Sequence, residues 1–175
     1  MTDPRYPIGK FNVDREVDDE KRRLWLAQIA EAPVDLRKAV AGLSAERLDT
    51  TYRPGGWTIR QVLHHLPDSH LNGYVRFKLA LTEEQPTIKP YLEAMWAETA
   101  DNQATPVEVS LVLLESLHER WVNLLRSLSS ADLARTFLHP QSGPMTLDAA
   151  VSLYAWHGRH HIAHITCLRQ ARGWI

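Results

Sequence analysis

The sequence YAWHGRHHIAHI, residues 154–165, places four of the nine histidines of this 175-residue chain within eight positions. These four are His157, His160, His161 and His164. A helix turns by about 100° per residue, so His157 and His161 share one side with Tyr154 and Ile165, inside an apolar stripe. Two imidazoles one turn apart are therefore predicted on a helix face that looks into a bundle.

A buried imidazole needs a partner, because an unpaired buried polar group costs about 1–3 kcal/mol. Two interpretations of the cluster follow. In one, each histidine is a core residue that is hydrogen-bonded to a neighbour. In the other, two histidines at positions i and i+4 chelate a metal ion, as such pairs do in helical metalloenzymes. Spacing alone leaves open whether the pair is His157 with His161 or His160 with His164.

A second histidine-bearing helix is predicted from WTIRQVLHHLPDSHLNGYVRF, residues 57–77. One side of it carries polar residues at helical spacing: His65, Asp68, Asn72 and Arg76. This stripe is either a solvated face or the lining of a polar pocket that faces the helix at 154–165. His64 competes with His65, since it could pair with Asp68 at i+4. Three histidines from two helices would form a zinc-type site with one position open for water or substrate.

Four segments have the length and the apolar periodicity of bundle helices. Their expected ranges are 18–43, 59–81, 106–128 and 147–172. Pro33 falls inside the first, so this helix is expected to kink or to restart there. Thr58 and Gln61 form a capping box that opens the second. Thr105, as an N-cap followed by Pro106, opens the third.

The remaining segments are expected to be connections. Residues 1–15 read as an extended arm, and residues 82–104 as a long linker with a short helix around 91–98. No segment shows the sustained alternation of a strand. We therefore predict one all-α domain over 1–175, a four-helix bundle with one long crossover connection.

Composition excludes several classes of protein. The net charge of -1 supplies no strong positive field for phosphates, so a nucleic-acid partner is not expected. We see no signal peptide and no apolar run that could span a bilayer, so neither secretion nor a membrane partner is expected. The single cysteine, Cys167, excludes an internal disulfide framework. A cytoplasmic location is the resulting expectation.

Two motifs make the chain resemble the DinB superfamily, and in particular its YfiT-like branch. They are WTIRQVLHHLPDS at 57–69 and HGRHHIAH at 157–164. The similarity extends over essentially the whole chain, including RYPIGKF, RFKLALTE and PTIKPY. The resemblance implies a homodimeric four-helix bundle with one divalent metal ion per chain, zinc or nickel. By this resemblance the ligands are His65, His157 and His161.

Two positions depart from the family pattern. Pro67 stands where the family usually has alanine, and its missing N–H should bend the helix two residues after His65. His164 stands where much of the superfamily has glutamine, and it is a candidate for a further polar contact at the site.

The resemblance also implies an activity on a small molecule. YfiT-like proteins are described as metal-dependent hydrolases, in which the metal lowers the pKa of a bound water toward about 7. The candidates for positioning or deprotonating that water are Asp68, Asn72, Arg76 and His164. One alternative is a thiol S-transferase, in which the metal binds a low-molecular-weight thiol as thiolate. A non-catalytic helical metal-binding dimer is the other.

Other conspicuous residues are interpreted as structural. Trp57 is expected to be a packing anchor, His118 a surface residue, and Cys167 a small core residue. His70 is rotated by about 140° from His65 on its helix and is expected to point elsewhere. His139, beside Pro140, is expected to lie in a loop.

Overall fold

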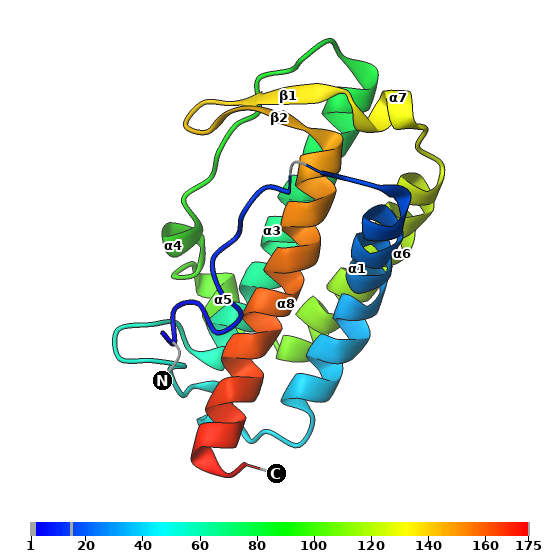
Figure 1. Ribbon diagram of the computed structural model, residues 1–175. Helices are drawn as coiled ribbons and strands as arrows, with labels where there is room; N and C mark the ends of the chain where they lie inside the picture. The colour runs from blue at the N-terminus through cyan, green and yellow to red at the C-terminus, as the bar shows by residue number, and fades with distance from the viewer. Residues whose placement is uncertain (1–2, 15, 175) are drawn as a thin grey trace.

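The computed structural model describes residues 3–14 and 16–174 of the chain. Its body consists of four long helices: α1 (Asp19–Val40), α3 (Ile59–Thr82), α6 (Val107–Arg126) and α8 (Leu147–Arg172). Each packs against two others, since α1 and α3 are both in contact with α6 and α8 (Figure 1). The predicted all-α four-helix bundle is confirmed. None of the described helices is both long and apolar enough to cross a membrane.

The start signals of the helices are local and mostly predictable. Thr58 and Gln61 form the predicted capping box at the beginning of α3. The prediction for α6 is wrong by one residue, because Pro106 is its N-cap. Thr105 instead ends a short preceding helix, since its N–H donates to the Asp101 carbonyl at 2.9 Å.

Two buried prolines lie inside long helices, Pro33 in α1 and Pro67 in α3. Both helices continue on either side of their proline, so the alternative of a restart at Pro33 is wrong. A proline has no N–H and leaves the carbonyl four residues earlier without its helical donor. For Pro33 that carbonyl belongs to Ile29, and the Nδ1 atom of His118 lies 2.6 Å from its oxygen.

Short elements fill the connections. The long crossover between α3 and α6 contains α4 (Glu93–Trp96) and α5 (Ala100–Ala104), close to the short helix predicted around 91–98. The other short elements are α2 (Ala45–Leu48), α7 (Ser130–Leu133), β1 (Thr136–His139) and β2 (Gly143–Thr146). The antiparallel β1–β2 hairpin was not predicted, because four-residue strands are too short to show an alternating pattern.

The apolar core has two parts with polar side chains between them. One part contains Phe77 of α3 and the early α8 residues up to Ala155. The other contains Leu63 of α3 and the late α8 residues from Ile165 onward. The histidines of both helices fall between these parts, so a polar layer crosses the middle of the bundle.

Candidate metal site

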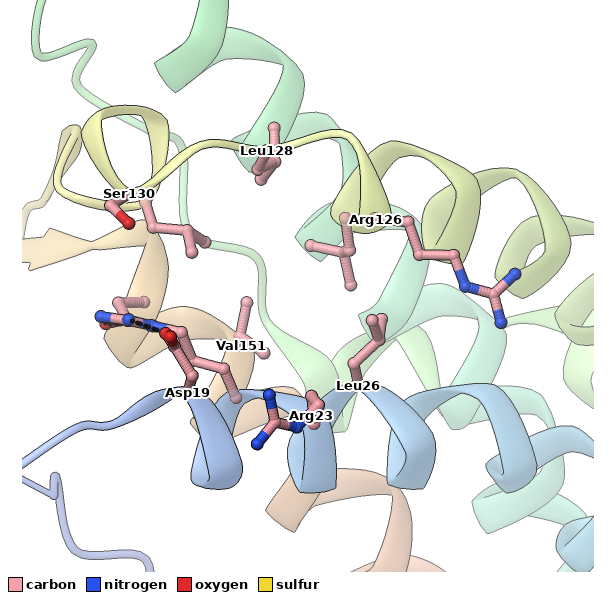
Figure 2. A pocket seen from close by; sticks show the side chains of 11 residues that line it. Asp19, Arg23, Leu26, Arg126, Leu128, Ser130 and Val151 are labelled. Atoms are coloured by element: carbon pink, nitrogen blue, oxygen red, sulfur yellow. Dashed lines mark hydrogen bonds and ion pairs between the residues drawn. The ribbon is translucent and has the colours of Figure 1, made fainter.

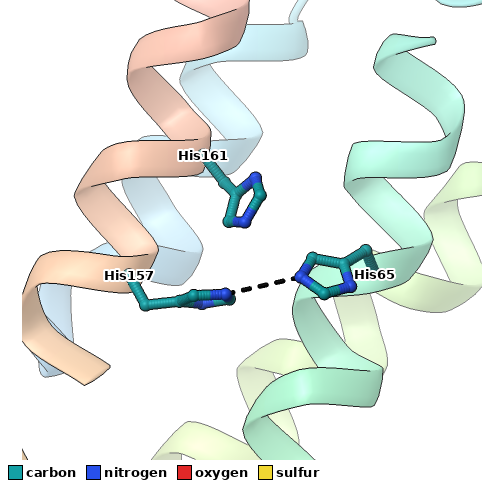
Figure 3. Close-up of side chains that lie close together, drawn as sticks. All are labelled: His65, His157 and His161. Atoms are coloured by element: carbon teal, nitrogen blue, oxygen red, sulfur yellow. Dashed lines mark hydrogen bonds between the residues drawn. The ribbon is translucent and has the colours of Figure 1, made fainter. Parts of the chain in front are cut away.

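Three histidines from two helices converge in this polar layer. His65 of α3 and His157 and His161 of α8 each offer a ring nitrogen, and these atoms all lie within 4.8 Å of one another (Figure 3). The Nε2 atoms of His65 and His157 are 3.4 Å apart. Ligand nitrogens about 2.0–2.1 Å from a tetrahedral zinc ion are themselves about 3.3 Å apart. The spacing therefore fits one small divalent cation shared by three imidazoles.

The three imidazoles are neutral at pH 7. Burial lowers the pKa of His65 to about 4. Burial, with the charges of neighbouring histidines as a smaller cause, also lowers the pKa values of His157 and His161 well below the usual range. A neutral imidazole carries a lone pair on one nitrogen, which is the form that binds metals.

The buried Nδ1 atom of His161 supports the fit to a ligand outside the chain. It has no hydrogen-bond partner among the described residues. Leaving such an atom unsatisfied costs about 1–3 kcal/mol. A histidine with an unpartnered nitrogen beside two converging imidazoles therefore suits a site that takes up an ion or water.

The competing histidines make different ring contacts, although the Nδ1 atoms of His160 and His164 also lack a hydrogen-bond partner among the described residues. The ring of His160 stacks on Trp156 with centroids 4.3 Å apart, and the ring of His164 stacks on Tyr52 at 4.0 Å. His64 does not pair with Asp68, as one alternative had it; its Nδ1 lies 2.7 Å from the hydroxyl of Ser110. The structure thus brings His65 together with the pair His157 and His161.

The three histidines open onto a cavity of about 700 Å³. Its walls come from the N-terminal arm, the loop before α3, α3 itself, the crossover, the hairpin and α8. Trp57 is part of this lining, with its ring centroid 4.7 Å from that of His65, so it packs against the site. The charged residues of the lining are three arginines and one carboxylate: Arg5, Arg53, Arg76 and Glu93.

The predicted polar stripe of α3 divides between two environments. Arg76 lines the cavity and donates to the Tyr154 hydroxyl at 3.3 Å, and His164 of α8 also lines it. Asp68 and Asn72 are not among the lining residues. The Asn72 side chain donates to the Asp68 carbonyl. Burial, assisted by the charge of Asp101, raises the pKa of the Asp68 carboxyl to about 6.

Two histidines that had been interpreted as remote belong to the same layer. His70 was expected to point elsewhere, yet its Nε2 atom lies 3.1 Å from Nδ1 of His157. The expectation of a surface position for His118 is wrong, since the residue is 1% exposed and bonded to His70. A signal was available: His118 falls in the helical series of Leu114, Leu117 and Trp121, which forms the buried face of α6.

Two further expectations need correction. Cys167 is exposed and is not a core residue. It follows the exposed Thr166 and precedes the buried Leu168, so it lies at the edge of the apolar stripe of α8. His139 ends strand β1 instead of lying in a loop, and it lines the cavity.

A second cavity, of about 320 Å³, lies between α1, α6, α7 and α8 (Figure 2). Its lining contains no histidine or cysteine among the described residues. Arg22 there is paired with Asp148 at 2.7 Å and with Asp19 at 3.0 Å. This cavity therefore lacks the ligand types of the histidine site.

Comparison with known proteins places the chain in a family. Residues 28–165 match the DinB superfamily. Proteins of Bacillus cereus (strain 03BB102) and Bacillus thuringiensis subsp. konkukian, each named "Putative metal-dependent hydrolase", are 58% identical over 174 residues, which cover 99% of this chain and 100% of each relative. A solved structure is described as "YfiT from Bacillus subtilis is a probable metal-dependent hydrolase with an unusual four-helix bundle topology". It superposes with a TM-score of 0.95 at 46% identity and covers 98% of this chain and 99% of that one. This chain therefore belongs to the DinB superfamily.

Proposed function

We propose that the chain is a metal-dependent hydrolase whose divalent ion, zinc or nickel, is held by His65, His157 and His161. The observation that carries the proposal is the convergence of these three neutral imidazoles in the lining of a large cavity. When bound, such an ion supplies Lewis acidity and lowers the pKa of a coordinated water toward about 7. The names of the similar Bacillus proteins and of the YfiT structure support the same class of activity.

The cavity favours a small substrate that carries negative charge. Arg53 and Arg76 line it, and neither is within ion-pair distance of a carboxylate among the described residues. The buried Nε atom of Arg53 has no hydrogen-bond partner among those residues. An arginine presents several N–H donors in a fixed fork that matches carboxylate and phosphate groups. These two side chains would orient an anionic substrate relative to the histidines.

A thiol S-transferase is the second candidate, and one observation favours it. The hydrogen bonds and ring contacts that join His65, His157 and His161 to described residues involve aromatic rings and other histidines, with no carboxylate among them. Hydrolysis usually employs a base close to the attacking water. A thiol whose pKa is lowered by a metal becomes a nucleophile without a protein base.

The first experiment is the metal content of tag-free protein by plasma mass spectrometry. We expect about one zinc or nickel per chain in the wild type. That metal should be lost in His65→Ala, His157→Ala and His161→Ala and kept in the matched control His160→Ala. No metal after purification and reconstitution would exclude both enzyme hypotheses and leave a structural histidine layer.

The two reactions are then separated by the nucleophile. A hydrolase consumes an activated ester or amide with water alone, whereas a transferase consumes an electrophile only when a thiol is supplied. Metal binding without turnover in either assay would favour the non-catalytic helical dimer. The homodimer implied by the family resemblance stays a prediction, and light scattering of the purified protein tests it.

A further inference from the structure

A chain of hydrogen-bonding groups starts at a carbonyl in α1 and ends at the candidate ligand His157. Pro33 supplies no N–H to the Ile29 carbonyl, which is therefore free to accept a hydrogen bond from outside the helix. The Nδ1 atom of His118 lies 2.6 Å from that oxygen. A carbonyl oxygen only accepts, so Nδ1 of His118 must carry the proton.

The proton on one histidine then determines the proton on the next. A neutral imidazole has one N–H, so a proton on Nδ1 of His118 leaves Nε2 as an acceptor. That Nε2 atom is 2.7 Å from Nδ1 of His70, which therefore donates. The Nε2 atom of His70 then accepts a hydrogen bond from Nδ1 of His157, at 3.1 Å. The Nε2 atom of His157 is left with its lone pair exposed.

This lone pair points toward the site. The Nε2 atom of His157 is the one that lies 3.4 Å from Nε2 of His65 (Figure 3). His70 is completely buried and His118 is 1% exposed, and neither is hydrogen-bonded or ion-paired to a carboxylate among the described residues. A cationic histidine here would be an unpaired buried charge, which is more costly than the neutral chain of donors and acceptors.

We propose that the Ile29 carbonyl, His118 and His70 form a relay that fixes the tautomer of His157 and presents its Nε2 lone pair to the metal ion. This proposal rests on the proposed function for its metal, but the tautomer itself does not. His118 and His70 are positioning residues, because they act through His157. The relay passes through α1, α6, α3 and α8 in turn, so it couples the orientation of one ligand to the packing of all four long helices.

The test compares three substitutions on α6. His118→Leu removes both hydrogen bonds of the residue, and His118→Gln keeps one donor and one acceptor. Leu114→Ala lies one turn away in the same buried face and controls for a general loss of stability. For each protein, the His157 tautomer is read from nitrogen-15 NMR of the metal-free and zinc-loaded forms. Zinc affinity is measured by competition with a chelator.

In the wild type we expect the proton of His157 on Nδ1 in both forms. His118→Leu should lower the population of that tautomer in the metal-free protein and weaken zinc binding by about 10–100-fold, as loss of a ligand's outer hydrogen bond does in metalloproteins. His118→Gln should keep more of the Nδ1 tautomer and more of the zinc affinity than His118→Leu. Leu114→Ala should change neither the tautomer nor the affinity.

A proton on Nε2 of His157 in the metal-free wild type would overturn the relay, even if the protein binds zinc. An unchanged tautomer and affinity in folded His118→Leu would also overturn it. Equal losses in Leu114→Ala would assign the effect to stability alone. If the wild type binds no metal, the proposed function fails, and the tautomer measurement still decides the relay.

Discussion

The ring of Tyr154 on α8 occupies the space that a side chain at Gly73 on α3 would need. A Cβ atom built on Gly73 would lie 2.7 Å from both the Cε1 and hydroxyl oxygen atoms of Tyr154. The same ring stands edge-on to His70, with centroids 5.4 Å apart, and its hydroxyl accepts from Arg76. The close approach of α3 and α8 beside the histidine layer thus depends on the absence of a side chain at position 73.

Gly73→Ala is therefore expected to destabilise the protein, although alanine is the better helix former. The added methyl meets an aromatic ring that is packed on several sides, and such overpacking costs about 1–3 kcal/mol. Gly158→Ala is the matched control, because its Cβ would lie 3.3 Å from the Ala32 methyl and needs a smaller adjustment. Urea unfolding of both variants measures the difference. A Gly73→Ala protein as stable as the wild type would contradict this packing.

Stability should fall between about pH 6.5 and pH 4 in metal-free protein. Burial lowers the pKa of His118 to about 4, with His70 as the titratable group that faces it. In this window the unfolded state binds more protons than the folded state, so the free energy of unfolding decreases as the pH falls. The titration of His118 alone lowers the free energy of unfolding by at most about 3 kcal/mol.

Denaturant unfolding from pH 7 to pH 4.5, with a chelator present, checks this dependence. His118→Gln has no titratable group at this position, so its stability should fall less steeply with pH than that of the wild type. Parallel curves for the two proteins would show that His118 is not neutral and buried as the structure describes.

The ion pair between Arg22 of α1 and Asp148 of α8 should contribute measurably to stability. Its atoms approach to 2.7 Å, and the Asp148 side chain is only 15% exposed. Such a partly buried charged hydrogen bond is expected to be worth about 1–2 kcal/mol. Asp148→Asn should lose that amount at low salt. Asp35→Asn, which breaks the exposed pair with Lys38, should change the free energy of unfolding by less than about 0.5 kcal/mol.

Cys167 should react with a thiol reagent in the native protein, because it is exposed. We expect one modified thiol per chain without denaturant, and the same metal content before and after modification. Cys167→Ser provides the unreactive control. Protection of the thiol until unfolding would mean that this part of α8 is covered in solution.

The sequence predicted the helices well because their signals are local. The capping box at Thr58 and the apolar periodicity of α8 act within one or two turns, and α8 ends at Arg172 as expected. The hairpin escaped prediction because its pairing joins residues on either side of a turn, and four-residue strands leave no periodic pattern. The N-cap of α6 was misplaced because α5, whose C-cap is Thr105, could not be foreseen from propensity alone.

What the sequence by itself determined was the inward face of α8, which His157 and His161 share. The rotation of one helix against another is a property of packing, and only the tertiary structure decided it. That rotation sends His65 toward α8 and His64 toward Ser110. It also places His118 between the Ile29 carbonyl and His70. A helical period gives the angle between residues on one helix, but hydrogen bonds between helices require the distances that side-chain packing sets.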